Sequence, residues 1–202
     1  MTVCIREFVP DDVAGVARLV VNTLAEFGFT SQVGGVERDL ASMHDHYRAP
    51  RAGFWVAEDE GAIVGTVAVR PKDESTCELK RLYVRADCRG TGLGERLYQQ
   101  AEAFARAAGY ERFWLDSSRR FKKAHRLYLR HGFTLIESLD NDWEDDVFEK
   151  RLRASSAPAP ETGLCAAEPV ARTDEPSLLT DERAPPLAVE VRDSPPKVEG
   201  HS

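Results

Sequence analysis

A glycine-rich loop between a strand pattern and a long helix pattern constrains this chain more than any other feature. Residues 77–84 alternate apolar and polar side chains, as a half-buried strand does, and residues 93–108 carry an apolar stripe at helical spacing. The segment between them contains three glycines, Gly90, Gly92 and Gly94. Because glycine has no Cβ, a ligand can approach this backbone closely. The unpaired amides and the dipole at the start of a helix attract anions, so the loop predicts a phosphate site with Arg89 at its lip.

Three kinds of phosphate loop compete for this segment. A Walker A loop needs a Lys-Ser/Thr pair after its last glycine, and none follows Gly94. A dinucleotide fingerprint needs a GxGxxG spacing after the first strand of its unit, whereas here the third glycine comes one residue early and the loop follows the fourth predicted strand. The acyl-CoA pattern R/Q-x-x-G-x-G/A fits Arg89 to Gly94 at every position.

A second motif lies downstream, where residues 124–133 read AHRLYLRHGF and match the pattern A-x-x-[LF]-Y-x-x-x-G-F. Together with the strand that opens at Glu78, the loop and the amphipathic helix, this motif makes the sequence resemble the GCN5-related N-acetyltransferases. The resemblance covers about residues 3–151. It implies an α/β fold with a mixed central sheet, and splayed strands where the acyl-CoA enters.

The rest of the pattern agrees with such a fold. Apolar spacing predicts helices over residues 13–27, 37–47, 92–108 and 122–131, and strands over 3–8, 54–58, 62–69, 77–84, 112–116, 133–136 and 147–150. The order βααβββαβαββ indicates one mixed α/β domain on a central sheet.

The composition changes abruptly after Arg153. Residues 154–202 hold eight of the eleven prolines and no aromatic residue, and nine acids against four bases give them a net charge of −5. Such a segment buries too little apolar surface to offset the entropy of ordering, so we expect a disordered Pro-rich acidic tail after a domain of residues 1–153. Of the total charge of −7, only −2 belongs to the domain, and this balance argues against general nucleic-acid binding.

The resemblance assigns cofactor-binding roles to two stretches. The main chain of the strand before the loop would pair with the pantetheine arm, and the loop amides would hold the pyrophosphate of acetyl-CoA. The residues concerned are Leu82, Tyr83, Val84, Arg89, Gly90, Thr91, Gly92, Leu93 and Gly94. The plainer alternatives are ordinary sheet packing and an ordinary strand-to-helix turn. The basic segment 119–123 could hold the 3′-phosphate or be a solvated helix start.

The resemblance also implies catalytic residues for direct attack of an amine on the acetyl carbonyl. Tyr128 would protonate the leaving thiolate; the alternative is a half-buried core tyrosine. Glu78 is the first candidate base, acting through water, and a salt bridge with Lys80 or Arg81 is its alternative. Asp116 is a second candidate base. Main-chain N–H groups near Val84 would polarise the carbonyl.

The four cysteines lack zinc or redox spacing, so we expect free thiols, no metal site and no cysteine nucleophile at Cys77 or Cys88. Acceptor recognition is expected from residues 26–29, His44, Tyr47 and the loop 139–146, which has five acids between Asp140 and Asp146. That acidic rim would steer a cationic acceptor or be a solvated turn.

The sequence therefore predicts an acetyl-CoA-dependent N-acetyltransferase acting on a small amine or a peptide amine. The alternative is a non-catalytic acyl-CoA-binding regulatory module. No apolar run is long enough to span a membrane, and the first residues lack a signal-peptide pattern, so we expect a cytoplasmic protein; a homodimer stays open.

Overall fold

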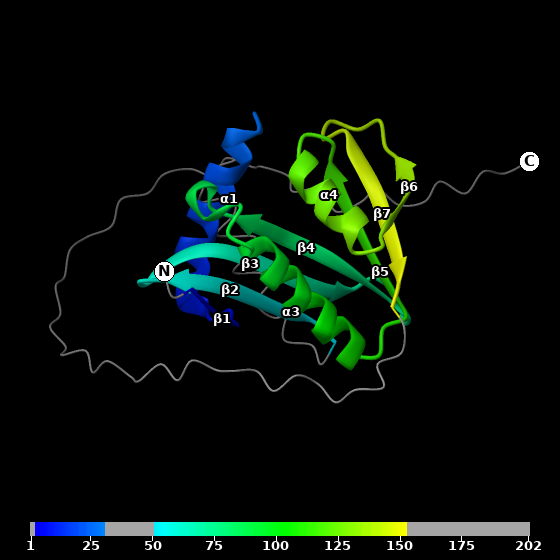
Figure 1. The fold of residues 1–202 in the computed structure, drawn as a ribbon, viewed down its shortest axis with the longest axis horizontal. Helices are drawn as coiled ribbons and strands as arrows, with labels where there is room; N and C mark the ends of the chain where they lie inside the picture. Colours follow the sequence, from blue (N-terminus) through cyan, green and yellow to red (C-terminus); the bar gives the residue numbers. More distant parts are fainter. Residues whose placement is uncertain (1–2, 31–50, 153–202) are drawn as a thin grey trace, which may run out of the picture. The chain divides into compact units, whose positions relative to one another are not determined.

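The computed structural model describes residues 3–30 and 51–152, which form one seven-stranded sheet with helices on both faces (Figure 1). The strands are β1 (Cys4–Glu7), β2 (Gly53–Asp59), β3 (Ala62–Pro71), β4 (Thr76–Val84), β5 (Arg112–Ser118), β6 (Thr134–Ser138) and β7 (Asp145–Arg151). The helices are α1 (Val13–Glu26), α3 (Leu93–Ala107) and α4 (Lys122–Arg130), with short 3₁₀ turns at Pro10–Asp12 and Ala86–Cys88. The predicted helix 37–47 and the predicted tail 154–202 lie outside the described residues.

The strand order is β1-β2-β3-β4-β5-β7-β6. All neighbouring strands are antiparallel except β4 and β5, which are parallel and joined through the crossover helix α3. This mixed sheet confirms the predicted α/β class, and every described strand and helix overlaps its predicted range. The hairpin between β2 and β3 turns at Glu60 and Gly61, with φ of 49° and 78°, as the Asp-Glu-Gly signal predicts.

Two apolar cores cover the two faces of the sheet. Helix α3 repeats small and apolar side chains every four residues, and these pack with Trp55, Val67 and Phe113 on one face. Helix α1 packs on the opposite face, where Val16 and Val20 meet Phe54, Val56 and other residues of β2 and β3. Because both faces are covered, the middle of β2 and β3 is buried at consecutive positions, as expected for strands inside such a sandwich.

Candidate active site at the divergence of β4 and β5

The two parallel strands at the centre of the sheet separate part-way along their length. Pairing between β4 and β5 joins Thr76 to Arg112 and ends at Glu78 and Trp114. Beyond that point the two strands diverge, as Figure 1 shows. Among the described residues, the edge of β4 that faces β5 therefore has no strand partner from Leu79 onward. The splay predicted from the family resemblance is confirmed, and the free main-chain edge includes the three residues predicted to pair with a pantetheine arm, Leu82, Tyr83 and Val84.

A β-bulge bends β4 within this free stretch. Thr66 lies opposite Tyr83, but Ala68 lies opposite Lys80, so β4 contains one extra residue. Within the bulge Arg81 has a positive φ of 54°, and the buried Thr66 hydroxyl donates to the Arg81 carbonyl at 2.8 Å. Bulges of this kind re-aim the strand after them. Here the bulge turns the end of β4 toward the glycine-rich loop.

The loop places unpaired amides at the start of α3. Gly90 and Gly92 have φ of 82° and 87°, and a Cβ on either would meet no atom within 4 Å. No hydrogen bond from the described residues reaches the N–H groups of Gly90 to Glu95; the first helical bond runs from the Arg96 N–H to the Gly92 carbonyl at 3.1 Å. The Thr91 hydroxyl fixes the turn by donating to the Cys88 carbonyl at 2.7 Å. These open amides at a helix start have the geometry that binds a phosphate.

Arg89 lies at the lip of the loop, as predicted, but its charge already has a partner. Its Nε donates to the Val84 carbonyl at 2.8 Å, which ties the loop to the end of β4. Its Nη1 and Nη2 donate to the two carboxylate oxygens of Glu26 at 2.5 and 3.2 Å. Glu26 is the last residue of α1, so this pair joins parts of the chain that lie 63 residues apart in sequence.

Tyr128 is the buried residue of α4, and its ring packs near Phe133 and Phe148. Burial raises the pKa of Tyr128, with a further rise from nearby Tyr83, while an interaction with Ser117 lowers it. The phenol therefore stays protonated at neutral pH. Tyr83 and Ser117 belong to β4 and β5 beyond the point where the pairing of these strands ends. Tyr128 therefore lies at the divergence and also in the core.

Glu78 lies at the last paired position of β4, where it is only 5% exposed. Its Oε2 accepts from the Arg70 Nε at 2.5 Å, and its Oε1 pairs with the Lys80 Nζ at 2.8 Å. Lys80 also donates to Asp116 Oδ1 at 3.0 Å. Burial alone lowers the pKa of Lys80, but the charges of Glu78 and Asp116 outweigh it and raise the value. Both oxygens of Glu78 are thus held by cations: the salt bridge with Lys80 is formed, Glu78 is buried, and Arg70, Lys80 and Asp116 are partly exposed.

Asp145 is a further acid at this site, and no pattern in the sequence separates it from its acidic neighbours. It opens β7 opposite Ser118 of β5, and its Oδ2 accepts from the Asn141 amide at 3.0 Å. Burial raises the pKa of Asp145, the Asn141 hydrogen bond lowers it, and the charge of Asp116 raises it further. Burial raises the pKa of Tyr83, and the charges of Asp116 and Asp145 also raise it. Carboxylates from β5 and β7 therefore converge beside the free part of β4.

The two buried cysteines lie in surroundings that disfavour ionisation. Burial raises the pKa of Cys77 to about 12, and the thiol donates to the Arg112 carbonyl. Burial and the neighbouring Asp87 raise the pKa of Cys88. A thiol must ionise to attack, so these shifts disfavour a nucleophilic role for both groups.

Comparison with known proteins identifies the family. The model of the acetyltransferase (GNAT) family matches residues 17–133. The chain belongs to this family. It is 31% identical to the uncharacterized N-acetyltransferase YjgM of Escherichia coli, over 65% of its own length and 82% of that protein. It is also 34% identical to the uncharacterized N-acetyltransferase C1271.07c of Schizosaccharomyces pombe, over 72% of its own length and 91% of that protein. The chain is thus an N-acetyltransferase, as its sequence predicts.

Solved structures agree with this assignment of the fold. One neighbour is yncA, a putative acetyltransferase from Salmonella typhimurium solved with acetyl-CoA; its TM-score is 0.63 at 20% identity, covering 78% of this chain and 98% of that one. No helix in the described part of this GNAT chain is long and apolar enough to cross a membrane. Nor do residues 3–30 and 51–152 contain a group of three His, Cys, Asp or Glu side chains that could hold a metal.

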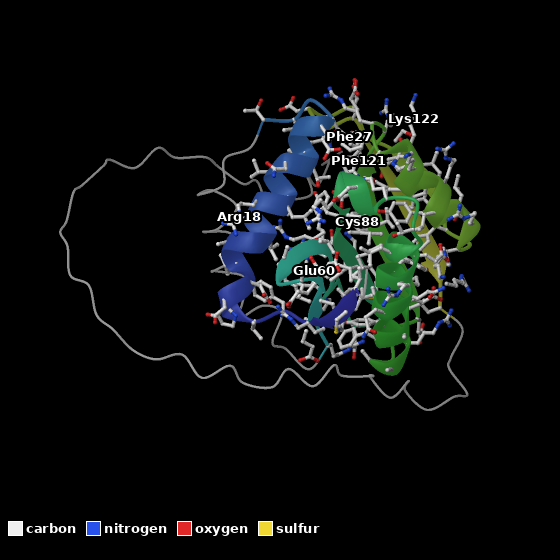
Figure 2. All side chains as sticks on the ribbon, turned by 60° about the vertical axis from the view of Figure 1, so that its left-hand side comes forward. Arg18, Phe27, Glu60, Cys88, Phe121 and Lys122 are labelled. Carbon is white, nitrogen blue, oxygen red and sulfur yellow. The ribbon has the colours of Figure 1, made fainter. Side chains whose placement is uncertain are left out.

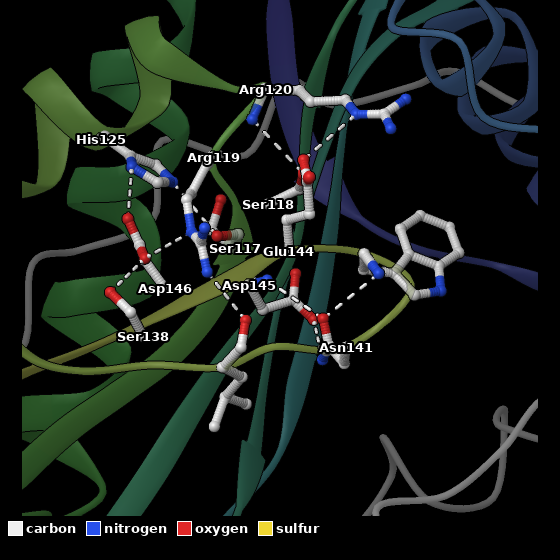
Figure 3. Close-up of polar contacts among 12 residues, drawn as sticks. Ser117, Ser118, Arg119, Arg120, His125, Ser138, Asn141, Glu144, Asp145 and Asp146 are labelled. Carbon is white, nitrogen blue, oxygen red and sulfur yellow. Dashed lines mark hydrogen bonds and ion pairs between the residues drawn. The ribbon is translucent and has the colours of Figure 1, made fainter.

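The acidic turn beside the acetyltransferase site is partly paired with nearby side chains (Figure 3). Asp146 accepts from the Ser138 hydroxyl at 2.7 Å and from the Arg119 Nε at 3.2 Å, and it faces His125 at 3.7 Å. Glu144 lies 3.8 Å from the Arg120 Nε. With Asp145 bonded to Asn141, three of the five acids have partners, which weakens the expected attraction for a cationic acceptor.

An aromatic cluster, formed by Phe27, Phe29, Phe121 and Trp143, spans the divergence on the side of α1. The Phe27 and Phe121 rings meet edge to face at 4.7 Å, and Figure 2 shows them side by side at the end of α1. Phe29 lies 5.7 Å from Phe121 and stacks on Trp143 at 4.4 Å. This cluster includes three of the residues expected to recognise the acceptor, Phe27, Phe29 and Trp143; two others, His44 and Tyr47, lie outside the described residues.

The basic segment 119–123 divides into two parts. Arg119 and Arg120 are exposed but have partners: Arg119 also donates to the Leu139 carbonyl at 2.8 Å, and Arg120 donates to the Phe27 carbonyl at 3.2 Å. Lys122 and Lys123 begin α4 and are exposed. Within the described residues neither lysine forms an ion pair, so these two are the charges in the segment that could meet a phosphate.

A surface hollow of about 530 Å³ lies along α1 and the β2–β3 turn. Its lining includes Arg18, Asn22 and Gly61, and it extends to Glu26 and to Arg85, the residue that follows β4. The main-chain groups without partners, in contrast, lie along the free edge of β4 and in the glycine-rich loop.

Proposed function

We propose that this GNAT enzyme transfers an acetyl group from acetyl-CoA to a primary amine of a small molecule or a peptide, by direct attack and without a covalent enzyme intermediate. The observation that carries the proposal is the row of unpartnered amides from Gly90 to Glu95 at the start of α3, next to the free edge of β4. The Salmonella neighbour of the same fold was solved with acetyl-CoA, which supports this cofactor.

The residues at the site fit this co-substrate. Open space beside Gly90 and Gly92 leaves room for phosphate oxygens against the backbone, and the helix dipole adds about half a positive charge. The main chain of Leu82, Tyr83 and Val84 would pair with the amide-bearing pantetheine arm as a neighbouring strand would. Acetyl-CoA supplies an activated thioester. The protein therefore has to position the two substrates, polarise the acetyl carbonyl, and supply and remove protons.

Positioning supplies much of the rate. Holding two reactants in line contributes roughly 7–11 kcal/mol in favourable cases. A main-chain N–H near Val84 would donate to the carbonyl oxygen as its charge develops. The Tyr128 phenol would donate a hydrogen bond to the departing thiolate. Because the pKa of a phenol already exceeds that of a thiol and burial raises the pKa of Tyr128 further, we expect a shared hydrogen bond in the transition state before any complete transfer.

The acceptor must lose a proton before it attacks. For an amine with a pKa of about 10.4, deprotonation at pH 7 costs about 4–5 kcal/mol. Glu78 is proposed to act through water, although both of its oxygens are engaged by Arg70 and Lys80. Asp116 and Asp145 offer the more accessible carboxylates on the same face, because each has one oxygen without a hydrogen bond from the described residues. We therefore extend the proposed bases to this pair.

Titration calorimetry with acetyl-CoA, followed by a thiol-release assay across small amines and peptide amines, tests the proposal. We expect saturable binding and turnover with at least one acceptor. Binding without turnover on any amine would favour the alternative, a regulatory module that only binds acyl-CoA. Absence of binding would contradict both.

A further inference from the structure

The C-terminal end of α1 is fastened to the cofactor loop by one ion pair. The Glu26 carboxylate receives two hydrogen bonds from Arg89, while Arg89 holds the Val84 carbonyl with its Nε. Three of the five guanidinium N–H groups are thereby used. Arg89 thus bridges α1, the end of β4 and the loop that is proposed to receive the pyrophosphate.

The pair is positioned so that it can be broken cheaply. Glu26 is the last residue of its helix, where the helix dipole disfavours a negative charge. The side chains of Arg89 and Glu26 are 23% and 38% exposed, so water screens their attraction. Pairs of this kind contribute up to about 1 kcal/mol. A pyrophosphate, which carries one negative charge on each of its two phosphates, can therefore replace Glu26 at Arg89.

The same end of α1 carries one side of the aromatic cluster. Phe27 follows Glu26 directly and packs on Phe121, while Arg89 lies 5.7 Å from the Phe27 ring. Through Phe121 and Phe29 the contacts continue to Trp143 on the loop before β7. Packed rings therefore connect the Glu26–Arg89 pair to the acceptor side of the divergence.

We propose that Glu26 competes with the pyrophosphate of acetyl-CoA for Arg89, so that cofactor binding releases the end of α1 and loosens the aromatic cluster that walls the acceptor side. Glu26 is then a positioning residue that couples the two substrates. This inference rests on the proposed function. Its physical basis is that a carboxylate held 2.5 Å from Arg89 repels a phosphate group on the adjacent amides, and that arginine binds phosphate in the same forked geometry.

Glu26→Gln keeps the size of the side chain and removes the competing charge. Because cofactor binding to the wild type must displace a pair of up to about 1 kcal/mol, we expect CoA to bind Glu26→Gln about fivefold more tightly in titration calorimetry. Asp87→Asn is the matched control: it removes an equal charge next to the loop, from a carboxylate that pairs with Arg85 at 2.7 Å and leaves Arg89 untouched. We expect less than about a twofold change for this control.

Trp143 supplies a readout that does not depend on turnover. Of the three tryptophans, Trp143 is 42% exposed, Trp55 is 3% exposed and Trp114 is partly buried, so acrylamide quenching of tryptophan fluorescence reports on Trp143 with a contribution from Trp114. In the wild type, CoA should raise the quenching of this residue. In Glu26→Gln, quenching should already be high without CoA and should change little when CoA is added. Trp143→Phe identifies the share of the signal that belongs to this residue.

The outcomes separate the inference from the function on which it rests. If CoA fails to bind the wild type, the proposed function fails. If CoA binds the wild type, but binds Glu26→Gln with equal or lower affinity, or changes the Trp143 signal equally in both proteins, the coupling is overturned and the proposed function stands. Melting temperatures of all variants confirm that each is folded.

Discussion

The glycine-rich loop allows two neighbouring substitutions to be compared directly. Gly92 has a φ of 87°, and an added Cβ would point into space with no atom within 4 Å. An alanine at this position would be strained by about 1–2 kcal/mol, because L residues disfavour left-handed backbone. For a domain of this size, that strain lowers the melting temperature by about 2–8 °C. Gly94 lacks a positive φ, and its Cβ would make an ordinary contact with Val84 at 3.7 Å. Gly94→Ala should therefore be neutral or stabilise α3 by up to about 1 kcal/mol.

Cofactor affinity should separate the two variants more sharply than stability does. If Gly92→Ala keeps its loop geometry, the strain is present with and without ligand and largely cancels from the dissociation constant. What remains is the methyl group in the space proposed for the pyrophosphate, a steric cost of about 1–3 kcal/mol. We expect calorimetry to show CoA binding weakened about 5- to 150-fold in Gly92→Ala and unchanged in Gly94→Ala. Unchanged binding in Gly92→Ala, or equal weakening in both, would refute the assignment of the pyrophosphate to these amides.

Three other changes test the remaining roles. Tyr128→Phe should lower kcat about 10- to 100-fold while CoA affinity and melting temperature stay near wild type; an unchanged kcat removes the phenol from the mechanism. Because the pKa of Asp145 is raised in the folded protein, its carboxyl favours folding below the unfolded pKa and loses this contribution as pH rises through the folded value. Asp145→Asn should thus melt higher than wild type at pH 8, by a margin that shrinks toward pH 4, and should turn over more slowly; a margin independent of pH contradicts the burial argument. Deleting residues 154–202 should leave melting and acetyl transfer intact, and lost activity would give the tail a role in the domain.

Local patterns in the sequence predicted the elements of this fold because each pattern depends on neighbours along the chain. The stripe of α3, the Asp59–Gly61 turn and the loop from Arg89 to Gly94 all have the structure expected of them. The divergence of β4 and β5 was predicted from family resemblance alone. Nothing in the residues themselves marks Glu78 as the last paired position, because that depends on strand twist and on helices packed from elsewhere.

The bulge at Arg81 illustrates a second limit. Positive φ usually favours glycine or asparagine, and an arginine gives no such signal. The partner that stabilises the bulge is the Thr66 hydroxyl on the neighbouring strand. Thr66 and Arg81 come together only when β3 and β4 pair in this register. A pattern within one strand therefore cannot predict the bulge.

Charge patterns were the least reliable guide, and for one physical reason. The sequence shows which charges exist, but a site depends on which of them remain unpaired after folding. The acidic turn loses part of its expected attraction because Arg119 and Arg120 reach it from the segment after β5, while Asn141 binds Asp145 from within the turn. Arg89 was predicted as a free phosphate ligand, yet it is held by Glu26 from a distant helix. Binding at such a position is an exchange of partners, so its affinity depends on the partner that is given up as much as on the one gained. Variants of Glu26 therefore measure a property of the cofactor site that variants of the loop alone cannot isolate.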